Sequence, residues 1–228
     1  MAKRQLILNG YKTAEDGLFT LASCKITKAS QVQTFVSVPG RFAPLDLSTT
    51  LTDGEPYYGS AGLDAVLESS EGTREERQSR IDELVNLLDG YQVQIIHPDR
   101  PGSYMVGRVQ VTPEYNDLVH CAVTLTAVCE AWFYNAEETV ITAEANTSPQ
   151  TVLLPNRGRL GVTPLVEVTG AVAIVYGDSS VNLSAGTYTL PWLHIRAAGG
   201  PASPNSLVIE VSGNGSVTFT YREAVLAE

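Results

Sequence analysis

Charged residues are scarce in this chain. Lysine, arginine, aspartate and glutamate together make up 18% of its 228 residues, below the quarter that is usual for a soluble globular protein. Hydrophobic residues make up 43%, which argues against disorder over most of the chain. Valine and threonine are frequent, and the chain contains 19 glycines. This composition favours a mainly β protein with large contact surfaces.

Positive charge is scarcer than negative charge. Residues 1–140 hold 11 Lys and Arg against 19 Asp and Glu, a net charge of −8, whereas residues 141–228 hold 4 against 6, a net charge of −2. An acidic protein has no general attraction for phosphate backbones or anionic lipids. Tight nucleic-acid binding is therefore disfavoured, although an acidic wall along which DNA slides stays compatible with this balance.

Cysteine is nearly absent, with three residues at Cys24, Cys121 and Cys129. The last two lie eight residues apart on one predicted strand, a separation of roughly 26 Å that excludes a bridge between them. An odd number of cysteines among apolar neighbours predicts reduced, buried thiols and assembly in a reducing cytosol.

Long hydrophobic runs are also missing. No stretch approaches the ~20 apolar residues of a membrane helix, and the apolar residues that follow Met1–Arg4 are too few for a signal-peptide core. We therefore expect a soluble protein that carries no export signal and does not insert into a membrane.

Patterns that carry chemistry are lacking as well. None of the histidines, His97, His120 and His194, stands in a metal-binding motif, and His97, which precedes a proline in a predicted turn, is expected to be exposed. Nucleophile elbows, phosphate loops and acid pairs in contrasting environments are not found. We predict no catalytic, cofactor-binding or metal-ligating residue, no cofactor, and no enzymatic activity.

What the chain does contain is a well-marked run from Thr73 to Val111. Thr73 and Glu76 have the spacing of a capping box, and a helix is predicted over about 73–89 with its apolar stripe at i, i+3, i+4 and i+7. The stripe consists of Ile81, Leu84, Val85 and Leu88. Gly90 stands where a helix needs a left-handed cap, and the sequence then predicts a strand at 91–95, a turn at 97–102 and a strand from Ser103 to Val111.

Residues 39–62 form a long segment rich in proline, glycine and aspartate. Irregular segments of this length inside a compact domain are usually functional or linkers. Two interpretations remain open: an excursion that reaches a neighbouring subunit, and a long surface loop.

The longest β-prone stretch runs from Leu118 to Tyr134. One parity is almost wholly apolar and the opposite parity is mixed. The apolar parity consists of Val119, Cys121, Val123, Leu125, Ala127 and Cys129. A strand of this kind suits a sheet that packs inward on one face and against a partner on the other.

Charge thins after Glu138, and short apolar runs then alternate with turn signals, a spacing that favours an antiparallel sandwich. We expect two domains, at 1–138 and 139–228. Because an exposed aromatic ring can stack on sugars, Trp192 is a candidate glycan contact; packing of this ring in a core or interface is the alternative.

Several short motifs resemble those of one known family. They are Val38-Pro39-Gly40-Arg41, the helix end Leu87-Leu88-Asp89-Gly90, the tip Asp99-Arg100-Pro101-Gly102, the strand Tyr104-Met105-Val106-Gly107-Arg108-Val109, and the final Tyr221-Arg222-Glu223-Ala224-Val225-Leu226. In this order they resemble the distal tail protein (Dit) of long-tailed siphophages over nearly the whole chain. The family-like structural positions are Pro39, Gly40, Arg41, Gly90, Tyr104, Gly107 and Arg108.

The resemblance implies a fold and an assembly. The N-terminal domain is expected to be a β-barrel-like fold with one helix, related to tail-tube proteins, and the C-terminal domain a peripheral galectin-like sandwich that the final motif closes. Six copies would form a ring, single or doubled, whose lumen continues the DNA channel between the tail tube protein and the tail-tip protein. Accessory or receptor-binding proteins would dock outside, and the protein would belong to the tail tip of a virion assembled in the bacterial cytoplasm.

Three functions therefore compete. The first is a structural baseplate hub, for which closed symmetry would satisfy strand edges that are left open in a single copy. The second is a carbohydrate-binding sandwich that acts in host-surface adhesion, and the third is a tail hydrolase. The hydrolase would need a triad or a pair of acids, and the sequence shows neither.

Overall fold

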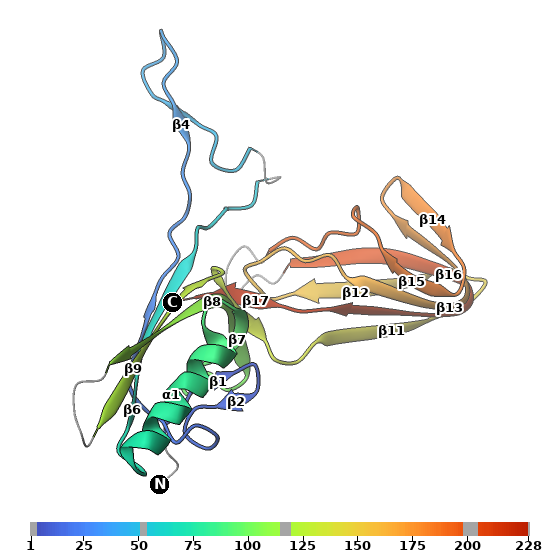
Figure 1. Ribbon diagram of the computed structural model, residues 1–228. Helices are drawn as coiled ribbons and strands as arrows, with labels where there is room; N and C mark the ends of the chain where they lie inside the picture. Colours follow the sequence, from blue (N-terminus) through green and yellow to red (C-terminus); the bar gives the residue numbers. More distant parts are fainter. Residues whose placement is uncertain (1–3, 51–53, 115–119, 198–204, 228) are drawn as a thin grey trace. The chain divides into compact units, whose positions relative to one another are not determined.

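The computed structural model describes residues 4–50, 54–114, 120–197 and 205–227 (Figure 1). It is mainly β, with antiparallel sheets and one α-helix among the described residues, which confirms the predicted fold class. The chain divides into two compact units, Met1–Tyr134 with Leu226–Glu228 and Asn135–Val225. None of the described helices is long and apolar enough to cross a membrane.

Unit 1 is built on one large sheet with the strand order β2-β1-β7-β8-β9-β6-β3, to which β10 adds by pairing with β8 and β17. Its strands are β1 (Ile7–Leu8), β2 (Tyr11–Lys12), β3 (Thr20–Thr27), β6 (Ala61–Ser69), β7 (Gln92–Ile96), β8 (Ser103–Glu114), β9 (Cys121–Cys129), β10 (Trp132–Asn135) and β17 (Ala224–Leu226). Two short strands, β4 (Phe35–Val36) and β5 (Leu45–Asp46), pair only with each other.

The centre of this sheet is formed by β6, β9 and β8, which pair in register over most of their lengths. The apolar parity of β9 lies in the core from Cys121 to Cys129, as its alternation predicts. All three cysteines are free thiols. The opposite parity is partly or fully exposed, and its most exposed member is Val128.

The helix α1 spans Arg74–Leu88 and begins with the predicted capping box. The Thr73 hydroxyl accepts from the Glu76 amide at 3.2 Å, and the Glu76 carboxylate accepts from the Thr73 amide at 2.7 Å. Ile81, Leu84 and Leu88 are buried in the core of unit 1 and Val85 packs beside them, which confirms the stripe. The helix is therefore fixed to one face of the sheet.

Gly90 has the predicted left-handed conformation, with φ 76°. Its amide donates to the carbonyl of Val109 in β8 at 2.8 Å rather than to the helix. Asp89, in extended conformation, caps the end of α1, and Gly90 starts the pairing of the following segment with β8.

The structure corrects the single strand predicted over 118–134. Pairing of β9 stops at Cys129, Glu130 and Ala131 interrupt it, and β10 begins at Trp132. The interruption is held by backbone bonds, since Glu130 N–H donates to Val106 O and Ala227 N–H donates to Ala131 O. Residues 118 and 119 lie outside the described residues.

The final motif also differs from the expectation. The last strand of the second sheet, β16, ends at Tyr221, whereas β17 pairs with β10 in the nine-stranded sheet. The polar segment at Arg222 and Glu223 separates the two strands, and Arg222 is anchored by donating to the carbonyls of Asn135 and Ala136, both at 2.6 Å.

Unit 2 is a second antiparallel sheet around its own core. Its strands are β11 (Thr139–Ala145), β12 (Gln150–Asn156), β13 (Leu165–Tyr176), β14 (Ser179–Leu183), β15 (Gly186–Thr189) and β16 (Asn205–Tyr221). The long strands β13 and β16 pair along their whole shared length. Different strands pair with the two halves of this two-stranded ribbon. β15 pairs with the first half of β13 and β11 with the last half of β16, whereas β14 pairs with the last half of β13 and β12 with the first half of β16.

Glycines at the midpoint allow the β13–β16 ribbon to fold back on itself, as Figure 1 shows for β16. Gly170, Gly213 and Gly215 have φ angles of 85°, 134° and 154°, which L side chains rarely adopt. A Cβ at any of the three would collide with a carbonyl oxygen of the paired strand. The fold-back gives two layers whose inward-facing side chains, among them Val168, Ile174 and Phe219, share one core.

We predict that Gly215→Ala destabilises unit 2 by about 2 kcal/mol or more, because the added methyl group meets the carbonyl of Thr169 in a backbone that is already strained. Denaturant unfolding followed by circular dichroism measures this change. The matched control is Gly177→Ala, at φ 56° in a turn with no atom close to its Cβ position, which should cost only about 1 kcal/mol. Equal denaturant midpoints for the two variants would show that the glycine at position 215 is not required for the fold-back of the ribbon.

Candidate assembly surface

Unit 1 carries a long projecting segment between β3 and β6, here called the arm, whose described residues are 28–50 and 54–60 (Figure 1, light blue). Nearly all of its described residues from 30 to 47 are exposed. The arm displays seven large hydrophobic side chains to solvent: Val32, Phe35, Val36, Val38, Phe42, Leu45 and Tyr57. Large exposed apolar groups gathered on one segment are typical of interaction sites.

The arm is a ribbon rather than a loose loop. Backbone bonds join its two sides at Val32–Tyr57, Gly59–Ser30 and Leu47–Thr34, with distances of 2.9, 2.9 and 2.8 Å. Near the tip, the Asp46 carboxylate accepts from the Ser48 amide at 2.9 Å, and hydrogen bonds from Ser48 lower the pKa of Asp46.

The predicted motif residues Pro39, Gly40 and Arg41 form the turn at the tip of the arm. The amide of Arg41 donates to the carbonyl of Val38 at 3.1 Å, and Gly40 has φ 85°. Proline followed by a glycine with positive φ is the requirement of a type II turn. The turn presents the exposed Arg41 side chain beside the fully exposed ring of Phe42.

A second feature of unit 1 is a depression of about 560 Å³ on the sheet face opposite the core, here called the sheet groove. It is lined by Asp64 of β6, by Thr126, Ala127 and Val128 of β9, by Arg108, Val109 and Gln110 of β8, and by Asp89 and Gly90. Apolar atoms dominate its surface, and Val128 at its floor is 67% exposed.

The structure brings the predicted residues Gly90 and Arg108 together at this groove, whereas Gly107 is buried and does not line it. The guanidinium of Arg108 donates to the carbonyl of Gly90, which ties β8 to the segment after α1. Gly107 is directly beside Cys129, and a Cβ there would collide with its sulfur. Predicted residue Tyr104 lies further along β8 and stacks on Tyr134, with 5.6 Å between ring centroids.

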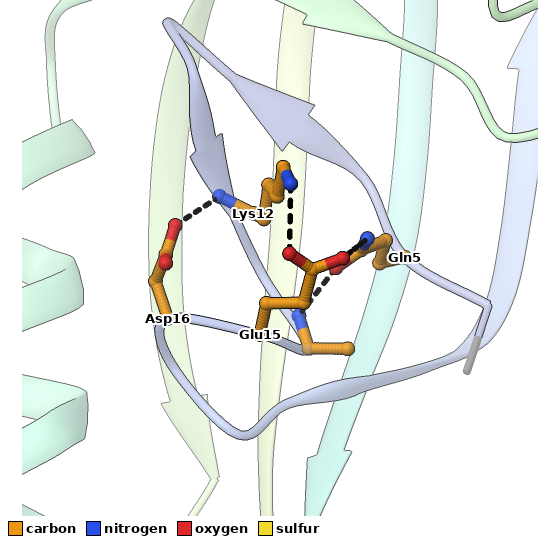
Figure 2. Close-up of polar contacts among 5 residues, drawn as sticks. Gln5, Lys12, Glu15 and Asp16 are labelled. Atoms are coloured by element: carbon orange, nitrogen blue, oxygen red, sulfur yellow. Dashed lines mark hydrogen bonds and ion pairs between the residues drawn. The ribbon is translucent and has the colours of Figure 1, made fainter. Parts of the chain in front are cut away.

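The end strands of the path β2-β1-β7-β8-β9-β6-β3, which are β2 and β3, are poorly suited to pairing with another strand. At one edge β2 is only two residues long, and Figure 2 shows a polar cluster around it. Glu15 accepts from Lys12 at 2.7 Å and from Gln5 at 2.8 Å, and Asp16 accepts from the Lys12 amide at 2.7 Å. At the other edge β3 contains a bulge between Leu21 and Ser23. Short charged edges and bulges discourage strand addition.

The described residues contain no candidate metal-binding cluster. No group of three or more His, Cys, Asp or Glu side chains there could hold a metal ion. Burial raises the pKa of Cys24 and of Cys129 to about 11, so both thiols are almost wholly protonated at neutral pH.

Trp192, the candidate glycan contact, is partly buried and packs against the core of unit 2. His194 nearby has its Nδ1 atom 3.3 Å from the hydroxyl of Thr163. The Trp192 ring therefore packs against the core, and its stacking on a sugar stays a prediction.

His97 is buried, with 8% of its surface exposed, so the expectation of an exposed turn residue is wrong. The 97–102 turn folds against the sheet: its Arg100 guanidinium lies over the ring of the buried Phe133 at 4.7 Å. The His97 Nδ1 atom accepts from the amide of Asp99 at 3.2 Å. Burial lowers the pKa of His97, against the opposing effect of Asp99.

Comparison with solved structures shows a similarity of fold. The fold is similar to the crystal structure of the Dit protein (gp 19.1) of SPP1, described as a paradigm of the hub adsorption apparatus in phages that infect Gram-positive bacteria. The TM-score is 0.63 at 15% sequence identity, over 96% of this chain and 98% of the SPP1 protein. No family model and no curated protein sequence matches the chain. The similarity therefore concerns the fold.

We predict that His97 makes unit 1 less stable in mild acid. Because its folded-state pKa lies below the unfolded value near 6.5, the unfolded state binds more protons as the pH falls through 6.5, and stability is lost there. The free energy of unfolding should fall more between pH 7 and pH 5 for the wild type than for His97→Gln. Parallel pH curves for the two proteins would show that His97 is not the titrating group.

Proposed function

We propose that this protein is a structural component of a phage tail tip, a hub whose copies assemble into a ring through the arm. The proposal is supported by a fold similarity that spans almost the whole of both chains. The exposed apolar side chains of the arm also support a structural role, because such a surface suits contact with another protein.

The observation that carries this proposal is the exposure of the arm. Seven large hydrophobic side chains on one segment remain in water in a single copy, and the ring of Phe42 is fully exposed. At about 25 cal/mol per Å² of apolar surface, covering such a segment is a substantial driving force for association. A soluble monomer rarely keeps a contiguous patch of this kind uncovered.

A contact between the arm of one copy and a different surface of the next copy is compatible with a ring. An arm that binds a different surface of the next copy makes a heterologous contact, which repeats until it closes into a ring or continues as a filament. In our proposal six copies close the ring, which stands alone or as one of two stacked rings. It joins the tail tube protein to the tail-tip protein.

The charge of the protein suits a passage for DNA. With a net charge of −10, the ring has no general attraction for a polyanion, so DNA could slide through without being held. In this proposal some of the acidic residues of unit 1 face the lumen. The protein is a virion component, assembled in the bacterial cytoplasm, and acts without catalysis or a cofactor.

Unit 2 is proposed to lie outside the ring and to anchor accessory or receptor-binding proteins. It is a galectin-like sandwich in this proposal, and its outward side chains are mostly small and uncharged. Examples are the paired hydroxyls of Thr142 and Thr218, 3.0 Å apart, and of Thr169 and Ser216, 2.7 Å apart. Such a surface suits contact with another protein.

The test is the assembly state of the purified full-length chain. We predict six times the monomer mass of 24.5 kDa, or twice that for stacked rings, by light scattering, and a six-fold view with a central hole by negative-stain microscopy. A variant without the arm should remain monomeric at the same concentration.

The variant joins Ser30 to Gly59 through an Asn-Gly turn, since these two residues already share a backbone bond of 2.9 Å. Its circular dichroism spectrum should stay close to that of the wild type, because Tyr58 is the one deleted residue among those described that packs against the core of unit 1, where its ring lies edge-on to Trp132. Assembly of this variant to the wild-type mass would contradict an arm-driven ring.

A further inference from the structure

We propose that unit 2 binds a flexible phosphate-bearing polymer through a group of polar side chains, here called the basic patch, which consists of Arg159, Thr163, His194 and Arg196. The inference goes beyond the proposed hub, because it concerns unit 2 alone and does not depend on assembly into a ring.

Positive charge in unit 2 is gathered at one end. Residues 141–228 contain no lysine and four arginines, which are Arg157, Arg159, Arg196 and Arg222. Two of them follow the end of β12, and Arg222 follows the end of β16. The fold-back of the ribbon at Gly170 and Gly213 carries no basic residue. A small number of cations is thus concentrated in one part of an otherwise acidic chain.

The buried side chain of Asn156 holds the arginine-bearing segments side by side. It is fully buried, and its amide donates to the carbonyls of Leu160 and Arg196 at 2.8 and 3.1 Å. The backbone amide of Arg159 donates to the carbonyl of Ala224 at 2.7 Å. The segment that carries Arg159 is therefore anchored beside the segment that carries Arg196.

A short antiparallel bridge sets the direction of the side chains on these two segments. Val162 and Ile195 exchange backbone bonds of 2.9 and 2.8 Å, and their side chains pack in the core of unit 2. Because side chains alternate along paired segments, the neighbours Thr163 and His194 lie on the opposite side, toward solvent. The Thr163 hydroxyl is 3.3 Å from the Nδ1 atom of His194, as expected for residues that face each other.

Arg196 and Arg159 belong to the same surface. By the register of the bridge, Arg196 lies opposite Gly161, which has no side chain to cover the surface there. Arg159 precedes Gly161 by two residues, and long side chains at such diagonal positions can reach a common ligand. Both arginine side chains are exposed. The basic patch therefore presents two guanidiniums beside an imidazole and a hydroxyl group.

The positive charge of this region is not neutralised within the chain. No ion pair among the described residues engages Arg157, Arg159 or Arg196. Glu223 comes close, but its carboxylate accepts from the backbone amide of Arg157, at 3.1 Å. Exposed guanidiniums without a carboxylate partner attract anions to their surface.

The donors of the basic patch fit a phosphate group better than a carboxylate. A carboxylate has two oxygens in one plane and matches a single arginine fork, whereas a tetrahedral phosphate can accept from two guanidiniums at once. Because the patch is exposed rather than enclosed, one phosphate alone would be held weakly. A polymer that carries many phosphates binds more tightly, since each further contact is made at a high effective concentration.

The test measures binding of labelled inorganic polyphosphate to the full-length chain by fluorescence anisotropy at low salt. We expect the wild type to bind, and Arg159→Gln and Arg196→Gln each to bind roughly tenfold more weakly, since each loses one charge-assisted contact. Both residues are exposed, so the circular dichroism spectra should stay unchanged. Absence of binding by the wild type overturns the inference.

The matched control is Arg74→Gln, which removes an exposed arginine from the first turn of α1 in unit 1. It changes the charge of the chain by the same amount and should alter the affinity by less than about twofold, because a distant exposed charge is screened. A loss equal to that of Arg196→Gln would show that polyphosphate responds only to overall charge, and would overturn the assignment to the basic patch.

Two further polymers test the chemistry of the ligand. Polyglutamate of matched length should bind about tenfold more weakly than polyphosphate, because each carboxylate engages a single guanidinium. Duplex DNA should bind weakly as well, because a stiff and densely charged duplex brings its charge against the acidic residues of the same chain. Equal binding of polyglutamate would contradict recognition of phosphate, and equal binding of DNA would assign the patch to nucleic acid instead of a flexible polymer.

The variant without the arm separates this inference from the proposed hub. It should still bind polyphosphate, because the basic patch lies within unit 2. Wild-type chains that bind polyphosphate but form no ring would support the inference and contradict the hub. Rings that do not bind polyphosphate would do the reverse.

Discussion

The proposed assembly depends on one constraint: the apolar side chains at the outer end of the arm are exposed rather than packed in the core of their own chain. Phe35 and Phe42 cannot reach the core of unit 1, because backbone bonds between the two sides of the arm keep it extended. In the proposed assembly, the hydrophobic effect therefore acts between copies instead of within one. The extended arm would then supply the apolar surface that drives association and would also set the distance to the partner surface.

The two units are built in different ways, each around its own core. In unit 1 a helix packs on the sheet, and the end strands β2 and β3 are poorly suited to pairing. The groove and the arm expose apolar groups. Unit 2 folds one long ribbon back on itself at Gly170 and Gly215, and so builds a separate core. Because each unit has its own core, assembly through unit 1 does not require any change in unit 2.

Features that depend on residues close together in the sequence could be predicted from it. The capping box at Thr73, the stripe of α1 and the buried parity of β9 depend on neighbouring residues, and all three were predictable. The break at Glu130 and the burial of His97 were not, because both depend on backbone and ring contacts with segments distant in the sequence. The pairing of β17 with β10 joins residues about ninety positions apart, which no local pattern encodes. Of the assembly surface, composition indicated the arm, whereas the groove forms only when β6, β8 and β9 pair.

The most direct test of the central claim is amide hydrogen exchange of residues 32–45 as a function of protein concentration. If another copy covers the arm, these amides should exchange slowly at concentrations where the protein is assembled and quickly after dilution, while those of β9 stay protected throughout. Fast exchange of the arm at every concentration, in a protein that nevertheless assembles, would show that the arm is not the contact that holds the copies together.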